Sequence, residues 1–148
     1  MKMFARAVSL ACIAAVPVLA HAQFAKPQDA IRYRQAVMTV MGSHFGRLAP
    51  YARGDKPLDA ADIQANVALV SAMAKLPWNA FGPGTQTDKV EDSIWSDSAK
   101  FKQAADRLQG DVAKLEAAAQ SGDQAQLRTA YGAVAASCKA CHDSFRKR

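Results

Sequence analysis

Apolar residues recur at three- and four-residue spacing in four segments of the chain, the spacing that places them on one face of an α-helix. These segments cover about residues 29–48, 59–75 and 97–122, and then 123 to about 145. Alternation typical of strands is nearly absent. The pattern predicts an all-α protein, an antiparallel up-down four-helix bundle whose helices bury their apolar faces against one another.

The residues at the segment ends agree with this prediction. Asp59, Asp123 and one of the neighbours Ser96 and Asp97 stand where a side-chain oxygen can cap the first N–H groups of a helix. Gln126 follows Asp123 by three residues, so we expect the two to form a reciprocal capping box.

The connections between the segments differ in length. Pro50 is expected to end the first helix, and the short connections after the first and third helices favour antiparallel neighbours. The connection from Leu76 to Trp95 is longer, and Phe81-Gly82-Pro83-Gly84 makes a helix unfavourable there. A loop of that length in a compact domain is usually functional, so we expect it to cover a functional site.

The N-terminus has the layout of a secretory signal peptide, with a short basic stretch, an apolar run and Ala20-His21-Ala22. Cleavage before Gln23 removes residues 1–22, including Cys12, and leaves a single domain of residues 23–148. The alternative is an uncleaved membrane anchor, but the run of about 14 apolar residues contains Pro17 and is short for a span. The sequence therefore predicts a periplasmic protein without a membrane anchor.

The formal net charge is +6, and loss of Lys2 and Arg6 with the signal peptide lowers it by two to +4. No basic patch is interleaved with aromatic residues, which argues against nucleic-acid binding. A mildly basic surface can instead steer anionic partners or ligands.

Cys138-Lys139-Ala140-Cys141-His142 is the strongest motif in the chain. A Cys-x-x-Cys-His sequence suits covalent attachment of haem c, because two thiols add to the two vinyl groups of one porphyrin edge and the histidine is carried under the iron. Three alternatives are a zinc site, a thioredoxin-like redox pair and a structural disulfide. A zinc site lacks a fourth strong ligand. A thioredoxin-like pair lacks its usual βαβ context, and a structural disulfide leaves His142 without a role.

The position of the motif restricts the second axial ligand of the iron. Only six residues follow His142 and none is methionine. A sixth ligand would therefore come from upstream: Met38, Met41, Met73, His44 or a lysine.

With Arg34 and Met38 one turn apart near the N-terminus and the motif near the C-terminus, the mature chain resembles cytochrome c′, a class II c-type cytochrome, of denitrifying β-proteobacteria. The resemblance covers essentially the whole mature chain and is carried by the segments Gln23-Phe24-Ala25-Lys26-Pro27, Ser43-His44-Phe45-Gly46-Arg47, Leu76-Pro77-Trp78, Ala80-Phe81-Gly82-Pro83-Gly84-Thr85, Ile94-Trp95-Ser96-Asp97 and Ser137-Cys138-Lys139-Ala140-Cys141-His142-Asp143.

The resemblance implies one haem per chain, with His142 as axial ligand of a five-coordinate, high-spin iron and Met38 over the opposite, distal face. Relatives have an aliphatic or aromatic residue in place of Met38. A thioether can ligate iron, so a low-spin electron carrier with Met38 as sixth ligand is the alternative. The resemblance also implies binding of nitric oxide and carbon monoxide, with Arg146 on the proximal face, and a homodimer formed through the first two helices.

Other residues are expected around the haem. An arginine on an inward helix face favours an anion, so Arg34, helped by Gln35, is assigned to a haem propionate; the alternative is a solvated helix residue. Lys89 or Glu91 could also approach the propionates. His44 is expected at the surface or an interface, and four aromatic residues are expected to pack around the porphyrin: Trp78, Phe81, Trp95 and Phe101.

Three functions follow from this reading. The first is a gas-binding haem protein that sequesters, carries or buffers nitric oxide, and the second is an electron carrier with periplasmic redox partners. The third, a haem enzyme, has the least support, because no general acid or base can be placed in the distal pocket. The expectation is therefore a protein that is not an enzyme.

Overall fold

The computed structural model describes residues 24–147, so the predicted signal peptide, residues 1–22, lies outside the described residues. Four long helices make up the described chain: α1 (Pro27–Arg47), α3 (Ala60–Met73), α5 (Ser98–Ser121) and α6 (Gln124–Phe145). Three short helices lie between them: α2 (Ala49–Arg53), η1 (Trp78–Ala80) and α4 (Ser93–Ser96).

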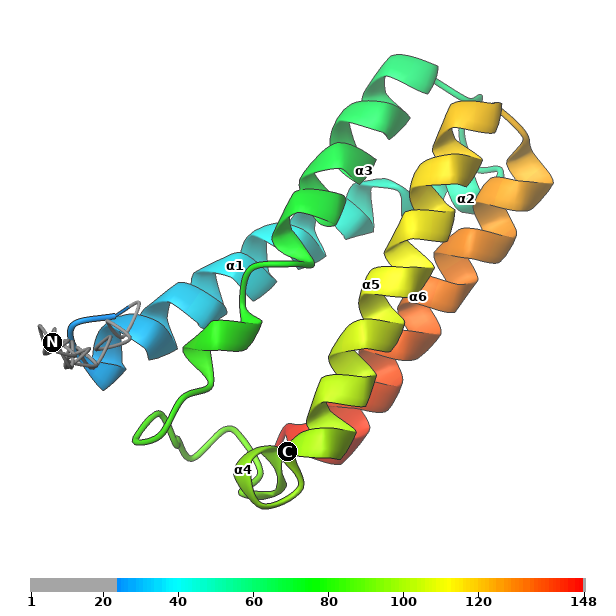
Figure 1. Ribbon diagram of the computed structural model, residues 1–148. Coiled ribbons are helices and arrows are strands. Elements are labelled where there is room, and N and C mark those ends of the chain that lie inside the picture. The colour runs from blue at the N-terminus through cyan, green and yellow to red at the C-terminus, as the bar shows by residue number, and fades with distance from the viewer. Residues whose placement is uncertain (1–23, 148) are drawn as a thin grey trace, which may run out of the picture.

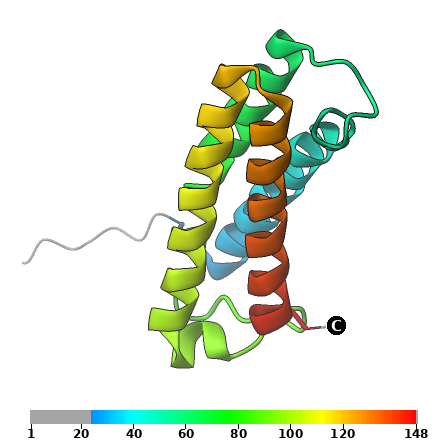
Figure 2. The same ribbon diagram turned by 90° about the vertical axis from the view of Figure 1, so that its right-hand side faces the viewer.

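Successive long helices run antiparallel and pack in the order α1 on α3, α3 on α5 and α5 on α6 (Figure 1). The turned view shows α5 and α6 side by side, with α1 crossing behind them at an angle (Figure 2). This arrangement confirms the predicted four-helix bundle. The pair α1 and α3 diverges from the pair α5 and α6 towards the end of the molecule that carries α4 (Figure 1).

The apolar core fills the half of the bundle nearer α2. Its buried members come from the second half of α1, from α2, from α3, from α5 after its first turns and from the first half of α6. The largest fully buried aliphatic side chains are Leu48, Val67, Val70, Val112, Leu115, Leu127 and Val134. Burial of each such side chain contributes roughly 1.5–3 kcal/mol, so this half supplies most of the cohesion of the fold.

The predicted N-caps are formed. Asp59, Asp97 and Asp123 each accept a hydrogen bond from the backbone N–H three residues later, at 2.9 to 3.2 Å. The reciprocal half of the predicted capping box is wrong, because the N–H of Asp123 donates to the Ser121 hydroxyl at 3.2 Å and not to Gln126.

The connections contain more helix than the sequence pattern predicts. The first helix ends at Arg47, but Pro50 does not end helical structure, since it lies in the first turn of α2, where a missing N–H costs no hydrogen bond. Gly54, with φ of +83°, ends α2. The long connection after α3 likewise contains η1 and α4.

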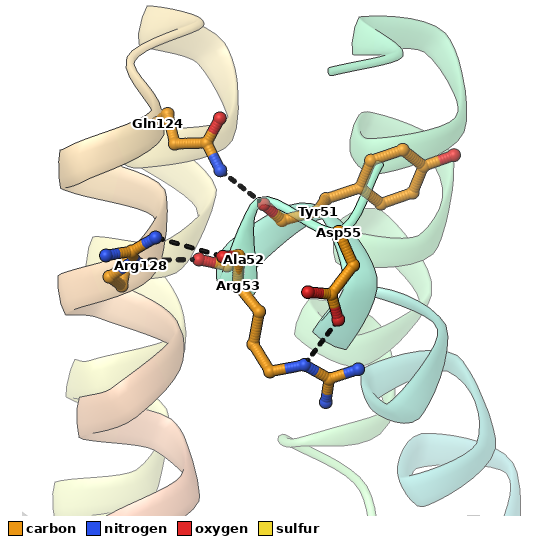
Figure 3. Close-up of polar contacts among 6 residues, drawn as sticks. All are labelled: Tyr51, Ala52, Arg53, Asp55, Gln124 and Arg128. Atoms are coloured by element: carbon orange, nitrogen blue, oxygen red, sulfur yellow. Dashed lines mark hydrogen bonds and ion pairs between the residues drawn. The ribbon is translucent and has the colours of Figure 1, made fainter. Parts of the chain in front are cut away.

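Two side chains of α6 cap the C-terminal end of α2 (Figure 3). Gln124 donates through Nε2 to the carbonyl of Tyr51 at 2.8 Å. Arg128 donates through Nε to the carbonyl of Ala52 at 3.1 Å and through Nη2 to that of Arg53 at 3.0 Å. Because the last carbonyls of a helix have no partner within the helix, these three bonds hold α2 against the start of α6.

Replacement of Arg128 by alanine is expected to lower the free energy of unfolding by about 1 kcal/mol, since two carbonyls of α2 lose a charged donor and turn to solvent. Arg53→Ala is the matched control: it keeps the Arg53 carbonyl and removes only an exposed ion pair with Asp55, so its effect should stay below about 0.5 kcal/mol. Urea titration followed by circular dichroism measures both. Equal effects of the two substitutions would contradict the role given to Arg128.

Candidate functional site

The half of the bundle away from the apolar core contains a cavity of about 840 Å³. Its walls come from the middle of α1, the connection after α3, the start of α5 and the C-terminal end of α6 with the residues that follow it. The volume lies in the range of pockets that hold cofactor-sized ligands, roughly 300–1,000 Å³. The diverging helix pairs therefore leave room for a group that the side chains do not supply.

The predicted attachment motif forms the α6 wall. Cys141 and His142 line the cavity, and Cys138, one helical turn before His142, is half-buried against the apolar core. Both thiols are free rather than paired in a disulfide. Helix α6 thus places the Cys141 sulfur and the His142 imidazole in the cavity wall, and the Cys138 sulfur between that wall and the apolar core.

Burial raises the pKa of the Cys138 thiol, and burial together with the neighbouring Cys138 raises the pKa of Cys141 to about 11. Both thiols are therefore protonated at neutral pH. A thioredoxin-like pair needs the opposite, a thiolate stabilised by its surroundings, so this electrostatic environment argues against that alternative.

His142 lines the cavity with part of its surface exposed. Its pKa is lowered, first by partial loss of solvent around the ring and then by the positive charge of Arg146, while Asp143 acts in the opposite direction. The imidazole is consequently held in its neutral form at neutral pH. This is the form that ligates a metal through a ring nitrogen.

The α1 wall faces the cavity with Arg34, Gln35, Met38 and Thr39. The Met38 side chain is half-buried and packs against the apolar core, so its position is defined by contacts on one side and by the cavity on the other. Met38 and His142 thus line the same cavity from two different helices.

Aromatic rings form a third wall. Phe101 lies at their centre, with its ring 5.9 Å from Trp78, 4.8 Å from Phe81 and 5.2 Å from Phe145, all edge to face. The predicted packing of Trp78, Phe81 and Phe101 around the site agrees with this geometry. Trp95 does not line the cavity; its indole N–H donates to the carbonyl of Phe81 at 2.8 Å and so supports the wall from behind.

Arg34 is buried, with 3% of its surface exposed, so its interpretation as a solvated helix residue is wrong. Its guanidinium donates to the Ala80 carbonyl at 3.1 Å, to the Thr85 hydroxyl at 3.0 Å and to the Thr85 carbonyl at 2.7 Å, and it lies 4.4 Å from the Phe81 ring centre. Burial lowers the pKa of Arg34, although an arginine stays charged at any physiological pH.

No carboxylate of the described residues forms an ion pair with this buried cation. A buried charge without a counterion is unfavourable, and Arg34 lines the cavity. Three of its five N–H groups are bonded to the neighbouring loop, which leaves donors for an anionic ligand. The residues present therefore fit a haem: thiols, a neutral imidazole, flat aromatic walls and a cation for a propionate.

The other predicted residues lie at the rim or elsewhere. Gln35, Lys89 and Arg146 are exposed and line the cavity. Glu91 does not line the cavity; its backbone N–H donates to the Phe145 carbonyl at 3.0 Å. His44 is half-buried and its Nδ1 lies 2.9 Å from the Asn66 amide oxygen, between α1 and α3.

The residue that sequence analysis missed is Thr85, which is buried and bonded to Arg34. In residues 24–147 no group of three or more His, Cys, Asp or Glu side chains is placed to hold a metal ion, and no helix there is long and apolar enough to cross a membrane.

Replacement of Arg34 by methionine is expected to lower the free energy of unfolding by about 2–3 kcal/mol, because the buried carbonyls of Ala80 and Thr85 lose their donors. Arg32→Met is the matched control on the same helix: Arg32 is exposed and pairs with Asp29, so the change should stay below about 0.5 kcal/mol. Denaturant titration of the two holoproteins measures the difference. A similar, small change in both variants would show that the buried bonds of Arg34 contribute little.

Comparison with known proteins agrees with this geometry. The family model for cytochrome c′ matches residues 29–146. Cytochrome c′ of Alcaligenes xylosoxydans xylosoxydans is 53% identical over 126 residues, covering 85% of this chain and 99% of the relative, and that of Rubrivivax gelatinosus is 47% identical over 129 residues, covering 85% and 100%.

Solved structures give the same result. A nitric oxide complex of a cytochrome c′ variant from Alcaligenes xylosoxidans superposes with a TM-score of 0.82 at 52% identity, covering 85% of this chain and 99% of the other. A carbon monoxide-bound variant of the same protein also gives a TM-score of 0.82 at 52% identity, covering 85% and 100%. The sequence match over nearly all of the described chain and the matching fold show that this chain belongs to the cytochrome c′ family, whose cofactor is covalent haem c.

Proposed function

We propose that this chain is an exported monohaem c-type cytochrome that binds small diatomic gases, nitric oxide and carbon monoxide, at a five-coordinate, high-spin iron. The observation that carries the proposal is the cavity lined on one side by the neutral imidazole of His142 and on another by the apolar side chain of Met38. Solved relatives with the same fold are complexes of nitric oxide and carbon monoxide.

Seven residues are assigned to the cofactor. Cys138 and Cys141 would hold the haem through thioethers and His142 would ligate its iron. Arg34 and Gln35 would hold a propionate, Met38 would cover the face opposite His142 and Arg146 would lie on the side of His142. When bound, haem supplies an iron with one open coordination position.

Met38 controls access to that open position. Its thioether side chain is apolar, so it excludes water and offers no hydrogen bond to an anion. An unbranched side chain with three rotatable bonds can move aside for a neutral diatomic molecule. Size and polarity together make the distal side selective for small neutral gases.

The second candidate function is electron transfer with Met38 as sixth ligand. It is favoured by one observation, the presence of a methionine on the cavity wall, since a methionine ligand gives a low-spin iron of higher potential. Redox partners would then dock where three basic residues, Lys89, Arg146 and Lys147, line the cavity beside Asp143. Catalysis has the least support, because the residues that line the cavity beside Met38 on α1, Gln35 and Thr39, are not general acids or bases.

Export and assembly belong to the same proposal. A signal peptide over residues 1–22 would direct the mature chain to the periplasm. The intact mass of the exported chain tests whether cleavage occurs before Gln23. Val40 on α1 and Leu69 on α3 are exposed apolar side chains on the helix pair expected to form a homodimer. A sedimentation mass equal to one chain would contradict the dimer.

Covalent attachment gives a direct prediction. Cys138→Ser together with Cys141→Ser is expected to remove the haem increment from the intact mass under denaturing conditions, whereas each single variant retains one thioether and the full increment. Retention of the mass increment in the double variant would contradict the assignment. Lys139→Ser, between the two cysteines, is the matched control and should keep both thioethers.

The role of Met38 is tested by optical spectra of oxidised and reduced holoprotein before and after nitric oxide or carbon monoxide. Wild type and Met38→Leu should both show broad high-spin bands that shift on gas addition, since leucine keeps the volume and removes only the sulfur. Met38→Ala should raise carbon monoxide affinity by about tenfold, as expected if about 1.4 kcal/mol of steric cost is removed. A low-spin wild type that becomes high-spin in Met38→Leu would instead show the electron carrier.

A further inference from the structure

One stretch of the connection after α3, residues 80–91, touches both walls of the cavity. We call this stretch the brace. It is fixed to α1 by Arg34, which donates to the Ala80 carbonyl at 3.1 Å, to the Thr85 hydroxyl at 3.0 Å and to the Thr85 carbonyl at 2.7 Å. The Thr85 hydroxyl also donates to the Gly82 carbonyl at 2.7 Å, and Thr85 has only 3% of its surface exposed.

The second end of the brace is fixed to the end of α6. Val90 and Arg146 form an isolated antiparallel bridge. The N–H of Glu91 donates to the Phe145 carbonyl at 3.0 Å, and the N–H of Lys147 donates to the Lys89 carbonyl at 3.1 Å. Residues 89–91 thus pair with residues 145–147 through one isolated bridge and two backbone hydrogen bonds.

The two attachments lie next to the two residues that face the cofactor. Arg34 is one helical turn before Met38 on α1, and Arg146 follows His142 by four residues, its N–H donating to the His142 carbonyl at 3.0 Å. Five residues separate Thr85 from Glu91, and they include a turn in which the N–H of Val90 donates to the Thr87 carbonyl at 3.4 Å. This short connection, with its own hydrogen bond, is the path through which a displacement at one attachment can reach the other.

We propose that the brace couples the α1 wall to the α6 wall, with Thr85 as the positioning residue at its α1 end. Thr85 orients the Arg34 guanidinium and, through the brace, fixes the segment of Phe145 and Arg146 beside His142. This role is separate from gas binding, because it concerns the chain's own hydrogen bonds and is measured without any gas.

The test is hydrogen exchange of the holoprotein, followed by mass spectrometry. Thr85→Val removes the hydroxyl but keeps shape, and it should speed exchange of the Glu91 and Lys147 amides by about tenfold, the factor expected for the loss of a hydrogen bond from a charged donor. Thr85→Ser restores the hydroxyl and should match wild type. Unchanged exchange at Glu91 and Lys147 in Thr85→Val overturns the proposal.

The reverse direction uses the other attachment and does not depend on the stability of the Thr85 variant. Lys147→Pro removes the N–H that bonds Lys89 near the chain end, and Lys147→Ala keeps it. We expect Lys147→Pro, but not Lys147→Ala, to speed exchange of the Ala80 and Phe81 amides near the α1 attachment. Identical exchange in both variants overturns the coupling.

A spectroscopic measurement separates coupling from general loosening. The hydrogen bonds of Thr85 run to Arg34 and Gly82, yet Thr85→Val should shift the iron–histidine stretching band of the reduced holoprotein, because the segment beside His142 moves. Amides of the apolar core at Leu115 and Val134 should exchange as in wild type. A band that stays at the wild-type frequency, or faster exchange throughout the core, contradicts a positioning role.

Discussion

The half of the bundle that contains the cavity depends on the hydrogen bonds of one buried group, the Arg34 guanidinium. It is a fixed positive charge that α1 carries inward to the cavity, and its partners on the protein are neutral: two backbone carbonyls and a hydroxyl. Such a charge is stable only if the surroundings supply oxygen atoms. The loop after α3 supplies some of them, and an anionic cofactor group would supply the rest.

The molecule consequently has two halves with different sources of order. Near α2, aliphatic side chains fill the space among the four helices, and hydrogen bonds from Gln124 and Arg128 hold α2 against α6. At the other end, the helices diverge around a cavity of about 840 Å³, and hydrogen bonds from Arg34 and from the backbone of residues 89–91 hold the walls. The half packed with aliphatic side chains supplies most of the stability of the fold, while the other half leaves room for a ligand.

The sequence predicts the helices well because periodicity and caps are local properties. Asp59, Asp97 and Asp123 cap as predicted, and the inward position of Arg34 follows from its helical stripe. Sequence analysis missed α2, since a proline that can end one helix can also begin the next. It also missed Thr85, because its contact with Arg34 joins residues 51 positions apart and no local pattern marks it.

In the proposed function the iron keeps one coordination position open on the side of Met38. Electron paramagnetic resonance of the oxidised, gas-free holoprotein tests this most directly, since it reports the spin state and therefore the number of strong axial ligands. We expect an axial high-spin signal, as one histidine ligand gives. A rhombic low-spin signal from the bulk of the iron would mean that a second protein ligand occupies the distal position, and it would contradict the account.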